Sequence, residues 1–225
     1  MLKVLYEDDE IIVVVKPAGV ESQAAKRFAP DMVSEIRKYL VIHKLCTPGK
    51  EPYVGVIHRL DKPVSGVMVY AKTKRAAAAL SEQVQSHKMK KIYTAVVYGK
   101  PVNTVDNYVD YLVKTPDGNY SQVVDKGITG AKKAELSYEV LKTIDGEENG
   151  MPGKGLSLVK VALKTGRHHQ IRVQLASIGC PIVGDTKYNP ELTGNKGWQT
   201  IRLCAYKLDF KHPVTHKAMH FQLEA

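Results

Sequence analysis

One carboxylate stands among cationic and polar side chains in the segment VIHRLDKPVSG, residues 56–66. Asp61 has Arg59 and Lys62 as close chain neighbours, and these cations should keep its carboxylate ionised. An ionised carboxylate that is held in place can act as a nucleophile, or stabilise charge, at a sugar carbon. Asp61 could equally cap a turn, as aspartate often does near proline and serine. The loop alone leaves both interpretations open.

The elements around this loop are predicted to be strands. The polar part of the loop, residues 58–65, follows the short apolar run Val54–Ile57 and precedes the apolar run Val67–Ala71. Loops between buried strands commonly hold reactive groups on a rigid scaffold. A hairpin of Lys3–Tyr6 and Ile11–Val15 opens the chain and ends at Pro17 and Gly19. Further strands are predicted at Lys90–Gly99, Val109–Val113, Lys132–Ile144, Gly155–Leu163, Leu203–Phe210 and Met219–Leu223, with a turn at Asp117-Gly118 and a loop over 145–155.

Three helices are predicted between the strands. Asp31 can cap the first, whose apolar residues up to Leu40 recur every three or four positions, and Thr73 can cap the second. The third runs from Arg167 to Ile178 after the tight turn at Thr165 and Gly166, and Gly179 with Pro181 ends it. Because helices and strands do not alternate regularly, we predict one α+β domain over residues 1–225, built on a large mixed sheet.

Composition narrows the class of protein. The chain has 225 residues, of which 44% are hydrophobic, and no apolar run approaches the roughly 20 residues that cross a bilayer. Lys and Arg number 33 against 23 Asp and Glu, so the net charge of +10 fits either a nucleic-acid partner or a generally basic protein. The acidic start and three scattered cysteines (Cys46, Cys180 and Cys204) favour the cytoplasm over secretion.

Three segments, taken in order, resemble the RluA family of pseudouridine synthases: VIHRLDKPVSGVMVYAKT, KIYTAVVYG and LKTGRHHQIRVQLASIGCPIVGDTKY. The opening LYEDDEIIVVVKPAGV and the closing RLCAYKLDFKHP are similar to that family too. The resemblance implies a single catalytic domain on a large mixed, mainly antiparallel sheet, with no separate N-terminal RNA-binding domain. It also implies uridine in rRNA or tRNA as the substrate, and neither cofactor nor metal.

The resemblance also implies roles for individual residues. Asp61 matches the catalytic aspartate, Tyr93 the tyrosine that stacks on uracil and assists proton transfer, and Arg172 the arginine that pairs with the aspartate. Arg59 matches the residue that fills the space of a flipped base. The residues expected to bind or shape the substrate site are His58, Arg59, Leu60, Lys91, Gly166, Arg167, His169 and Gln170.

Each role has a plainer alternative. Tyr93 could be a core aromatic, and Arg172 could be a solvated charge or half of a structural ion pair. A zinc site of His58 with the pair His168-His169 is disfavoured, because adjacent histidines point to different helix faces and no ligand spacing completes a tetrahedron. The family pattern also commonly has threonine where this chain has Val64.

The functional hypotheses are therefore ranked. We expect an RNA pseudouridine synthase, an isomerase that works as a monomer in the cytoplasm. The main alternative is an inactive RNA-binding protein on the same scaffold. A glycosidase ranks last, because the loop lacks the second positioned acid that such enzymes need. RNA recognition should then rest on the basic surface and the inserted stretch Lys100–Lys132.

Overall fold

Strands form most of the protein in the computed structural model, which describes residues 2–24, 30–144, 155–192 and 200–224. The elements in chain order are β1 (Lys3–Glu7), β2 (Ile11–Lys16), α1 (Met32–Ile42), β3 (Gly55–Val56), β4 (Ser65–Ala71), α2 (Lys74–Gln85), β5 (Lys90–Tyr98), β6 (Val105–Lys114), β7 (Ser121–Val124), β8 (Lys132–Ile144), β9 (Leu156–Leu163), α3 (Gln170–Ser177), β10 (Leu203–Lys211) and β11 (Ala218–Gln222). The predicted α+β class, a large mixed, mainly antiparallel sheet with helices, is confirmed.

The described chain divides into two compact units. One contains residues 1–91 and 205–225, and the other contains residues 92–204. Each unit is described by itself below. That residues 1–225 act as one catalytic domain stays a prediction.

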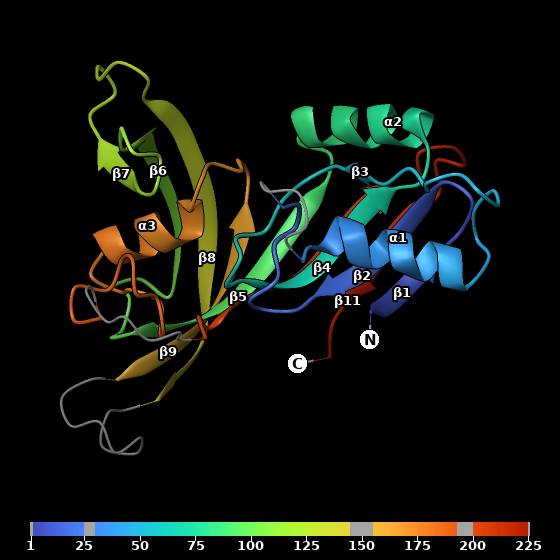
Figure 1. Ribbon diagram of the computed structural model, residues 1–225. Helices are drawn as coiled ribbons and strands as arrows, with labels where there is room; N and C mark the ends of the chain where they lie inside the picture. Colours follow the sequence, from blue (N-terminus) through green and yellow to red (C-terminus); the bar gives the residue numbers. More distant parts are fainter. Residues whose placement is uncertain (1, 25–29, 145–154, 193–199, 225) are drawn as a thin grey trace. The chain divides into compact units, whose positions relative to one another are not determined.

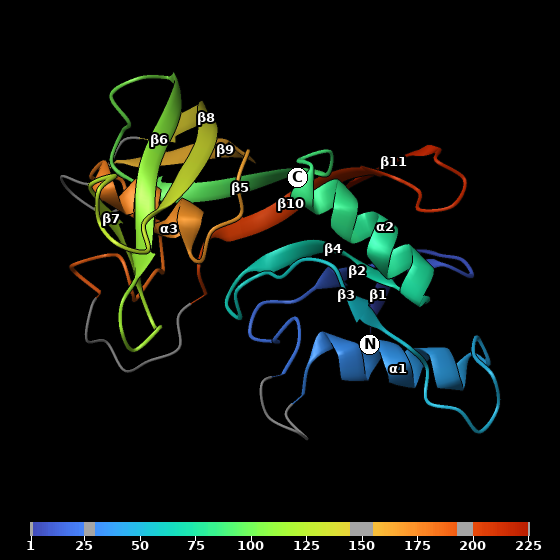
Figure 2. The same cartoon turned by 90° about the horizontal axis from the view of Figure 1, so that it is seen from above.

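In the first unit the strands follow the order β1-β2-β4-β10, with β3 beside β4 and β11 beside β10. Both faces of β2 are buried, as its unbroken apolar sequence requires. Ile11 and Val13 pack with Ala76 and Leu80 of α2 in one apolar cluster. The side chains between them point the other way. Helix α1 covers that opposite face, so the strands lie between α1 and α2 (Figures 1 and 2).

Both predicted helix caps of this unit are confirmed. Asp31 is extended and its Oδ1 accepts a hydrogen bond from Ser34 N at 2.8 Å, while Thr73 Oγ1 accepts from Ala76 N at 3.1 Å. These side chains satisfy amides that have no partner inside the helix, which is why both helices begin where the sequence indicates.

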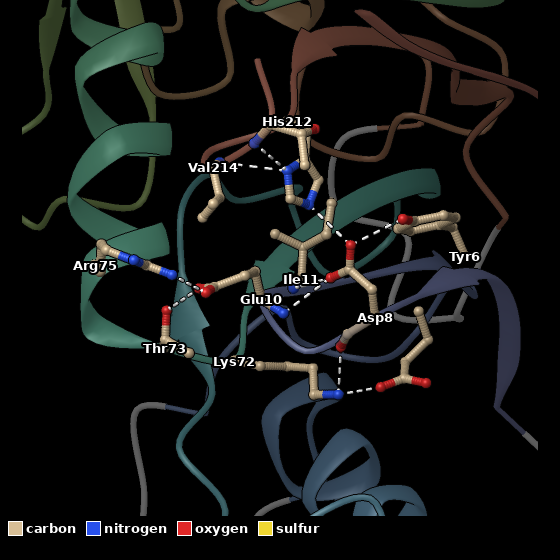
Figure 3. A network of polar contacts seen from close by, with 11 residues as sticks. Tyr6, Asp8, Glu10, Ile11, Lys72, Thr73, Arg75, His212 and Val214 are labelled. Atoms are coloured by element: carbon tan, nitrogen blue, oxygen red, sulfur yellow. Dashed lines mark hydrogen bonds and ion pairs between the residues drawn. The ribbon is translucent and has the colours of Figure 1, made fainter. Parts of the chain in front are cut away.

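A polar network joins the β1–β2 turn to the segment that follows β10 (Figure 3). Asp8 Oδ1 accepts from the amides of Glu10 and Ile11, each at 2.9 Å, and its Oδ2 accepts from the Tyr6 hydroxyl at 2.8 Å. His212 Nε2 lies 2.8 Å from the same Oδ2. Since His212 Nδ1 accepts from the amide of Thr215 at 3.0 Å, the ring proton is on Nε2 and is donated to Asp8.

In the second unit the strand order is β5-β9-β8-β6-β7, and α3 packs against β6 and β7 (Figure 1). Strand β6 begins at Val105, four residues before the predicted start, because it pairs with β8 as far as Val105↔Glu139. Asp117 and Gly118 lie in the turn between β6 and β7, as predicted. Nearly all of the predicted loop over 145–155 falls outside the described residues.

None of the helices among the described residues has the length and apolar composition needed to cross a membrane.

Candidate active site

The HRLD loop connects β3 to β4, and hydrogen bonds to its backbone groups hold it in place. Asp61 is half-buried, and its carbonyl accepts from Val64 N at 3.0 Å, which closes a turn. The Ser22 hydroxyl binds both backbone polar groups of Leu60: it donates to Leu60 O at 2.8 Å and accepts from Leu60 N at 3.0 Å. Val64 is 2% exposed, so packing fills the position where the family commonly has threonine.

Gly66 lets β4 start immediately after this loop. Its φ is +139°, and a Cβ there would lie 2.3 Å from the carbonyl oxygen of Ala205. Only glycine allows β4 to approach this backbone so closely. In the pairing of β2 with β4, Gly66 lies opposite Lys16, which sets the end of β2 beside the loop.

Lys16 is a site residue that the sequence reasoning missed. Its side chain is fully buried, and its ammonium donates to the carbonyls of Pro17, Val20 and Lys62 at 3.0, 2.6 and 3.1 Å. Burial lowers the pKa of Lys16 to about 8, against an opposing effect of the Asp61 charge. The available signal was a lysine that ends the otherwise apolar strand IIVVVK.

The three residues before Asp61 have different environments. His58 is 8% exposed, and its Nε2 accepts from Val69 N at 3.3 Å, so the loop is attached to β4. Burial, and secondarily the charge of Lys91, hold the pKa of His58 well below its usual value, so the ring is neutral. Leu60 is buried and Arg59 is exposed. His58 and Leu60 thus shape the loop, whereas direct contact of any of the three with RNA stays a prediction.

Two predicted residues lie on β5. Lys91 is half-buried, and burial lowers the pKa of its ammonium. Tyr93 is 6% exposed and shares its buried face of the strand with Ala95 and Val97. This burial is what a core aromatic would also show, so it does not by itself decide the role of Tyr93.

Arg172 lies on α3 and is 4% exposed. It makes a bidentate ion pair with Asp185: Nε donates to Oδ2 and an Nη donates to Oδ1, both at 2.7 Å. The same carboxylate accepts from the amide of Lys187 at 2.9 Å. Arg172 is therefore not a solvated surface charge. Its predicted pairing with Asp61, which belongs to the other unit, stays a prediction.

Comparison with known proteins decides the family. The model for RNA pseudouridylate synthase matches residues 10–177. Ribosomal large subunit pseudouridine synthase D of Zymomonas mobilis is 32% identical over 99% of this chain and 69% of its own length. The chain belongs to the RNA pseudouridylate synthase family. It is thus a pseudouridine synthase, an isomerase, and the predicted activity is confirmed at that level.

Other relatives agree with this assignment. The tRNA pseudouridine synthase C of Haemophilus ducreyi is 34% identical over 95% of this pseudouridine synthase and 87% of its own length. Human RNA pseudouridylate synthase domain containing 4 has the same fold, with a TM-score of 0.75 at 22% identity, over 99% of this chain and 88% of the human chain. The matched family region includes Asp61, Tyr93 and Arg172, whereas Asp185 lies beyond it.

The TGRHHQIR segment of this pseudouridine synthase forms a closed turn before α3. Gln170 is 3% exposed, and its Oε1 accepts from Thr165 Oγ1 at 2.8 Å and from Arg167 N at 3.0 Å. Gly166 and Arg167 are exposed. The helix begins at Gln170, so its predicted start at Arg167 was wrong. The reason is that His169 takes a left-handed conformation, with a φ of 54° and no side-chain cap.

The two histidines of this segment contact neighbouring elements. The His168 and His169 rings stack at 3.7 Å, with Ser121 Oγ 2.9 Å from His168 Nδ1 and the Tyr188 hydroxyl 2.8 Å from His169 Nδ1. Burial, followed by the charge of Arg172, lowers the pKa of His169 to about 2, so His169 is neutral. The Arg172 guanidinium lies 5.2 Å from the centre of the Tyr188 ring. His169 therefore belongs to the packing that surrounds Arg172.

Proposed function

We propose that this pseudouridine synthase isomerises uridines in RNA with Asp61 as the nucleophile. One observation carries the proposal: Asp61 is a half-buried carboxylate on a loop whose backbone is held on both sides by Ser22 and Lys16, inside the matched family region. Preorganised placement of a reacting group is what such chemistry requires.

The reaction conserves every atom of the nucleotide. Asp61 bonds to the anomeric ribose carbon as the bond to the ring nitrogen breaks, or it removes a proton from the neighbouring ribose carbon in a glycal route. The uracil then turns over and its carbon 5 bonds to the anomeric carbon. This step releases the carboxylate in the first route, and in the glycal route Asp61 returns the proton to the neighbouring ribose carbon. Carbon 5 loses its proton and the ring nitrogen gains one.

Other residues complete the proposal. Tyr93 stacks on the uracil and takes part in proton transfer from carbon 5, and Arg172 pairs with Asp61 and orients it. Exposed Arg59 enters the RNA and fills the space of the flipped base. Lys91, Gly166 and Arg167 meet the RNA backbone, with His58, Leu60, His169 and Gln170 shaping the surfaces behind them.

The substrate class follows from the relatives. Because the names of the bacterial relatives specify large-subunit ribosomal RNA or tRNA, we propose one of these two as the substrate. Purified RNA of each class, incubated with the enzyme and mapped for pseudouridine, separates them. We further propose that the enzyme works as a monomer in the cytoplasm, a setting that suits its three free cysteines. Light scattering during size-exclusion chromatography tests the monomer.

The decisive experiment measures tritium release from RNA labelled at carbon 5 of uracil. Wild type should release tritium, and Asp61→Asn should slow release by at least about 10³-fold, because the amide cannot act as the nucleophile. Asp9→Asn, the same change at an exposed carboxylate of the same unit, should match wild type. No release by wild type from either RNA class would favour the alternative, an RNA-binding protein without activity.

A further inference from the structure

Tyr120 is an exposed aromatic residue at the end of the turn between β6 and β7. Among the described residues of the second unit it is the only exposed tyrosine, with 36% of its surface accessible. A single exposed aromatic residue is common on protein surfaces and needs no function by itself. The contacts of Tyr120 are therefore what matters, because a side chain binds a ligand best when it is already held in its bound orientation.

Hydrogen bonds within the turn fix the backbone that carries Tyr120. Thr115 N donates to Tyr120 O, and Tyr120 N donates to Thr115 Oγ1, both at 3.1 Å. Asn119 N donates to the Asp117 carboxylate at 3.0 Å. Gly118 N donates to Thr115 O at 2.8 Å, and the φ of Gly118 is +69°, a conformation that favours glycine. The turn therefore presents Tyr120 from a backbone that is held on both sides.

Two residues of the segment after α3 hold the ring of Tyr120. The Lys187 ammonium lies 5.0 Å from the ring centre and donates to Asn119 O at 2.7 Å. The Tyr188 ring meets the Tyr120 ring edge-on, with centroids 6.0 Å apart and planes at 75°. The Tyr188 hydroxyl accepts from Ser121 N at 2.8 Å, so the residue after Tyr120 is tied to the same segment. Because a cation covers one face of the Tyr120 ring, a planar ligand can stack only on the opposite face.

Tyr120 lies close to the residues of the second unit that the proposed function uses. Strand β7, which begins at Ser121, packs against α3 (Figure 1). Ser121 Oγ lies 2.9 Å from Nδ1 of His168 in the TGRHHQIR segment. The Arg172 guanidinium lies 5.2 Å from the centre of the Tyr188 ring, which Tyr120 contacts on its own side. One aromatic ring thus separates Tyr120 from Arg172, the proposed partner of the nucleophile.

We propose that Tyr120 is a substrate-binding residue: an unpaired base that flanks the target uridine stacks on its ring, which Lys187 holds from the other face. Proteins bind unpaired RNA bases by stacking them on aromatic side chains, and any base can stack because each has a flat π face. The proposal rests on the proposed function and adds a feature of the substrate, an unpaired nucleotide beside the uridine that is isomerised.

The test compares Tyr120→Leu with Tyr120→Phe. Leucine keeps an apolar side chain but removes the flat ring, whereas phenylalanine keeps the ring. Fluorescence anisotropy with labelled tRNA and labelled large-subunit rRNA fragments measures the Kd of each variant. Tyr120→Leu should raise the Kd for the RNA that the enzyme modifies by roughly 5- to 100-fold, the usual effect of one stacked base. Tyr120→Phe should stay within about twofold of wild type. Tyr53→Leu, the same change at an exposed tyrosine of the first unit, should match wild type.

Two further measurements separate stacking from a distorted turn. Stacking releases no counterions, so Tyr120→Leu should keep the wild-type slope of log K against log salt. At saturating RNA its single-turnover rate should stay within about threefold of wild type, because a contact made equally before and during the reaction changes affinity alone. The proposal is overturned by a Tyr120→Leu that binds both RNA classes like wild type, by one with a smaller salt slope, or by a Tyr120→Phe that binds as weakly as Tyr120→Leu.

Wild type provides a separate measurement if Tyr120→Leu does not fold. With tyrosine ¹³C-labelled in the ring, saturating RNA should move the Tyr120 ring signal upfield, because a stacked base shields the protons on its face; the signal missing from Tyr120→Phe assigns it. A Tyr120 signal that stays in place while RNA binds would reject the proposal. The measurement needs no isomerisation. If wild type makes no pseudouridine, the proposed function fails, and the Tyr120 signal still decides whether a base stacks there.

Discussion

Buried ionisable side chains of the candidate site either have neighbouring groups that compensate their charge or stay neutral. Lys16 is surrounded by carbonyls, Arg172 shares two hydrogen bonds with Asp185, and His169 stays neutral. In a low-dielectric interior, removal of one partner leaves the other charge without compensation, which costs more than the pair itself contributes. The Lys16 ammonium thus depends on three backbone carbonyls, and the Arg172 guanidinium depends on the Asp185 carboxylate.

The Arg172–Asp185 pair yields a prediction about stability. Asp185→Asn should lower the free energy of unfolding by about 3–5 kcal/mol, because it removes the negative charge of the carboxylate that accepts two hydrogen bonds from the buried Arg172 guanidinium. Glu139→Gln is the control, since it breaks an exposed pair with Lys160 and should cost under about 1 kcal/mol. Urea denaturation measures both. Equal losses in the two variants would show that burial of the pair has no energetic consequence.

Contacts between residues that are close in the chain could be predicted from the sequence, whereas contacts between distant residues could not. Asp31 and Thr73 cap helices through amides three residues away, so the starts of α1 and α2 could be predicted. Lys16 binds a carbonyl 46 residues away, and Arg172 pairs with a carboxylate 13 residues away on another element. Neither partner follows from periodicity. The motifs thus identified the segments of the site, whereas the side chains that hold those segments required the structure.

At the scale of elements, turns are held by side chains from distant segments. In the second unit, Gln170 closes the turn before α3 with its own side chain, and it joins this turn to β8 by donating to Glu135 O, 35 residues away, at 3.1 Å. In the first unit, Asp8 and His212 join the β1–β2 turn to the segment after β10 (Figure 3). Such contacts fix where elements begin, independently of intrinsic propensity.

The Asp8 network predicts a pH dependence of stability. Burial opposes ionisation of Asp8, but hydrogen bonds, first from the amides of Ile11 and Glu10 and then from Tyr6 and His212, outweigh it and lower its pKa. Below the ordinary aspartate pKa the unfolded chain binds more protons than the folded protein, so stability rises with pH there. The stabilisation from Asp8 is complete above about pH 4 to 5 and is lost as pH falls through the lowered pKa.

Asp8→Asn isolates this contribution. At pH 7 the variant should be less stable than wild type, and the difference in free energy of unfolding should shrink as the pH falls from about 5 towards 2. Urea denaturation at a series of pH values measures the difference. Asp9→Asn, at the exposed neighbouring position, should show no such trend. A constant difference for Asp8→Asn would mean that ionisation of Asp8 does not stabilise the folded protein.

At the scale of the whole molecule, the excess of 33 basic over 23 acidic residues matches an enzyme whose family acts on RNA. Cations that contact phosphates release counterions, so the logarithm of the binding constant should fall linearly with the logarithm of salt concentration. The charge of Asp61 makes no such contact. Asp61→Asn, which we expect to be inactive, should therefore bind RNA with the wild-type salt dependence, and this would separate recognition from chemistry.

Arg167 provides the sharpest test of where RNA binds. It is exposed at the TGR turn, and Lys133 O accepts from its Nε at 2.8 Å, which holds the guanidinium in place while its other donors can meet a phosphate. Arg167→Ala should reduce the slope of log K against log salt by roughly one, measured by fluorescence anisotropy with labelled RNA. Arg75→Ala is the matched control. Arg75 lies on the first unit and already pairs with Glu10 of that unit, so this substitution should leave the slope unchanged. If both substitutions change the slope equally, the basic character of the chain acts as a diffuse field and Arg167 has no particular contact with RNA.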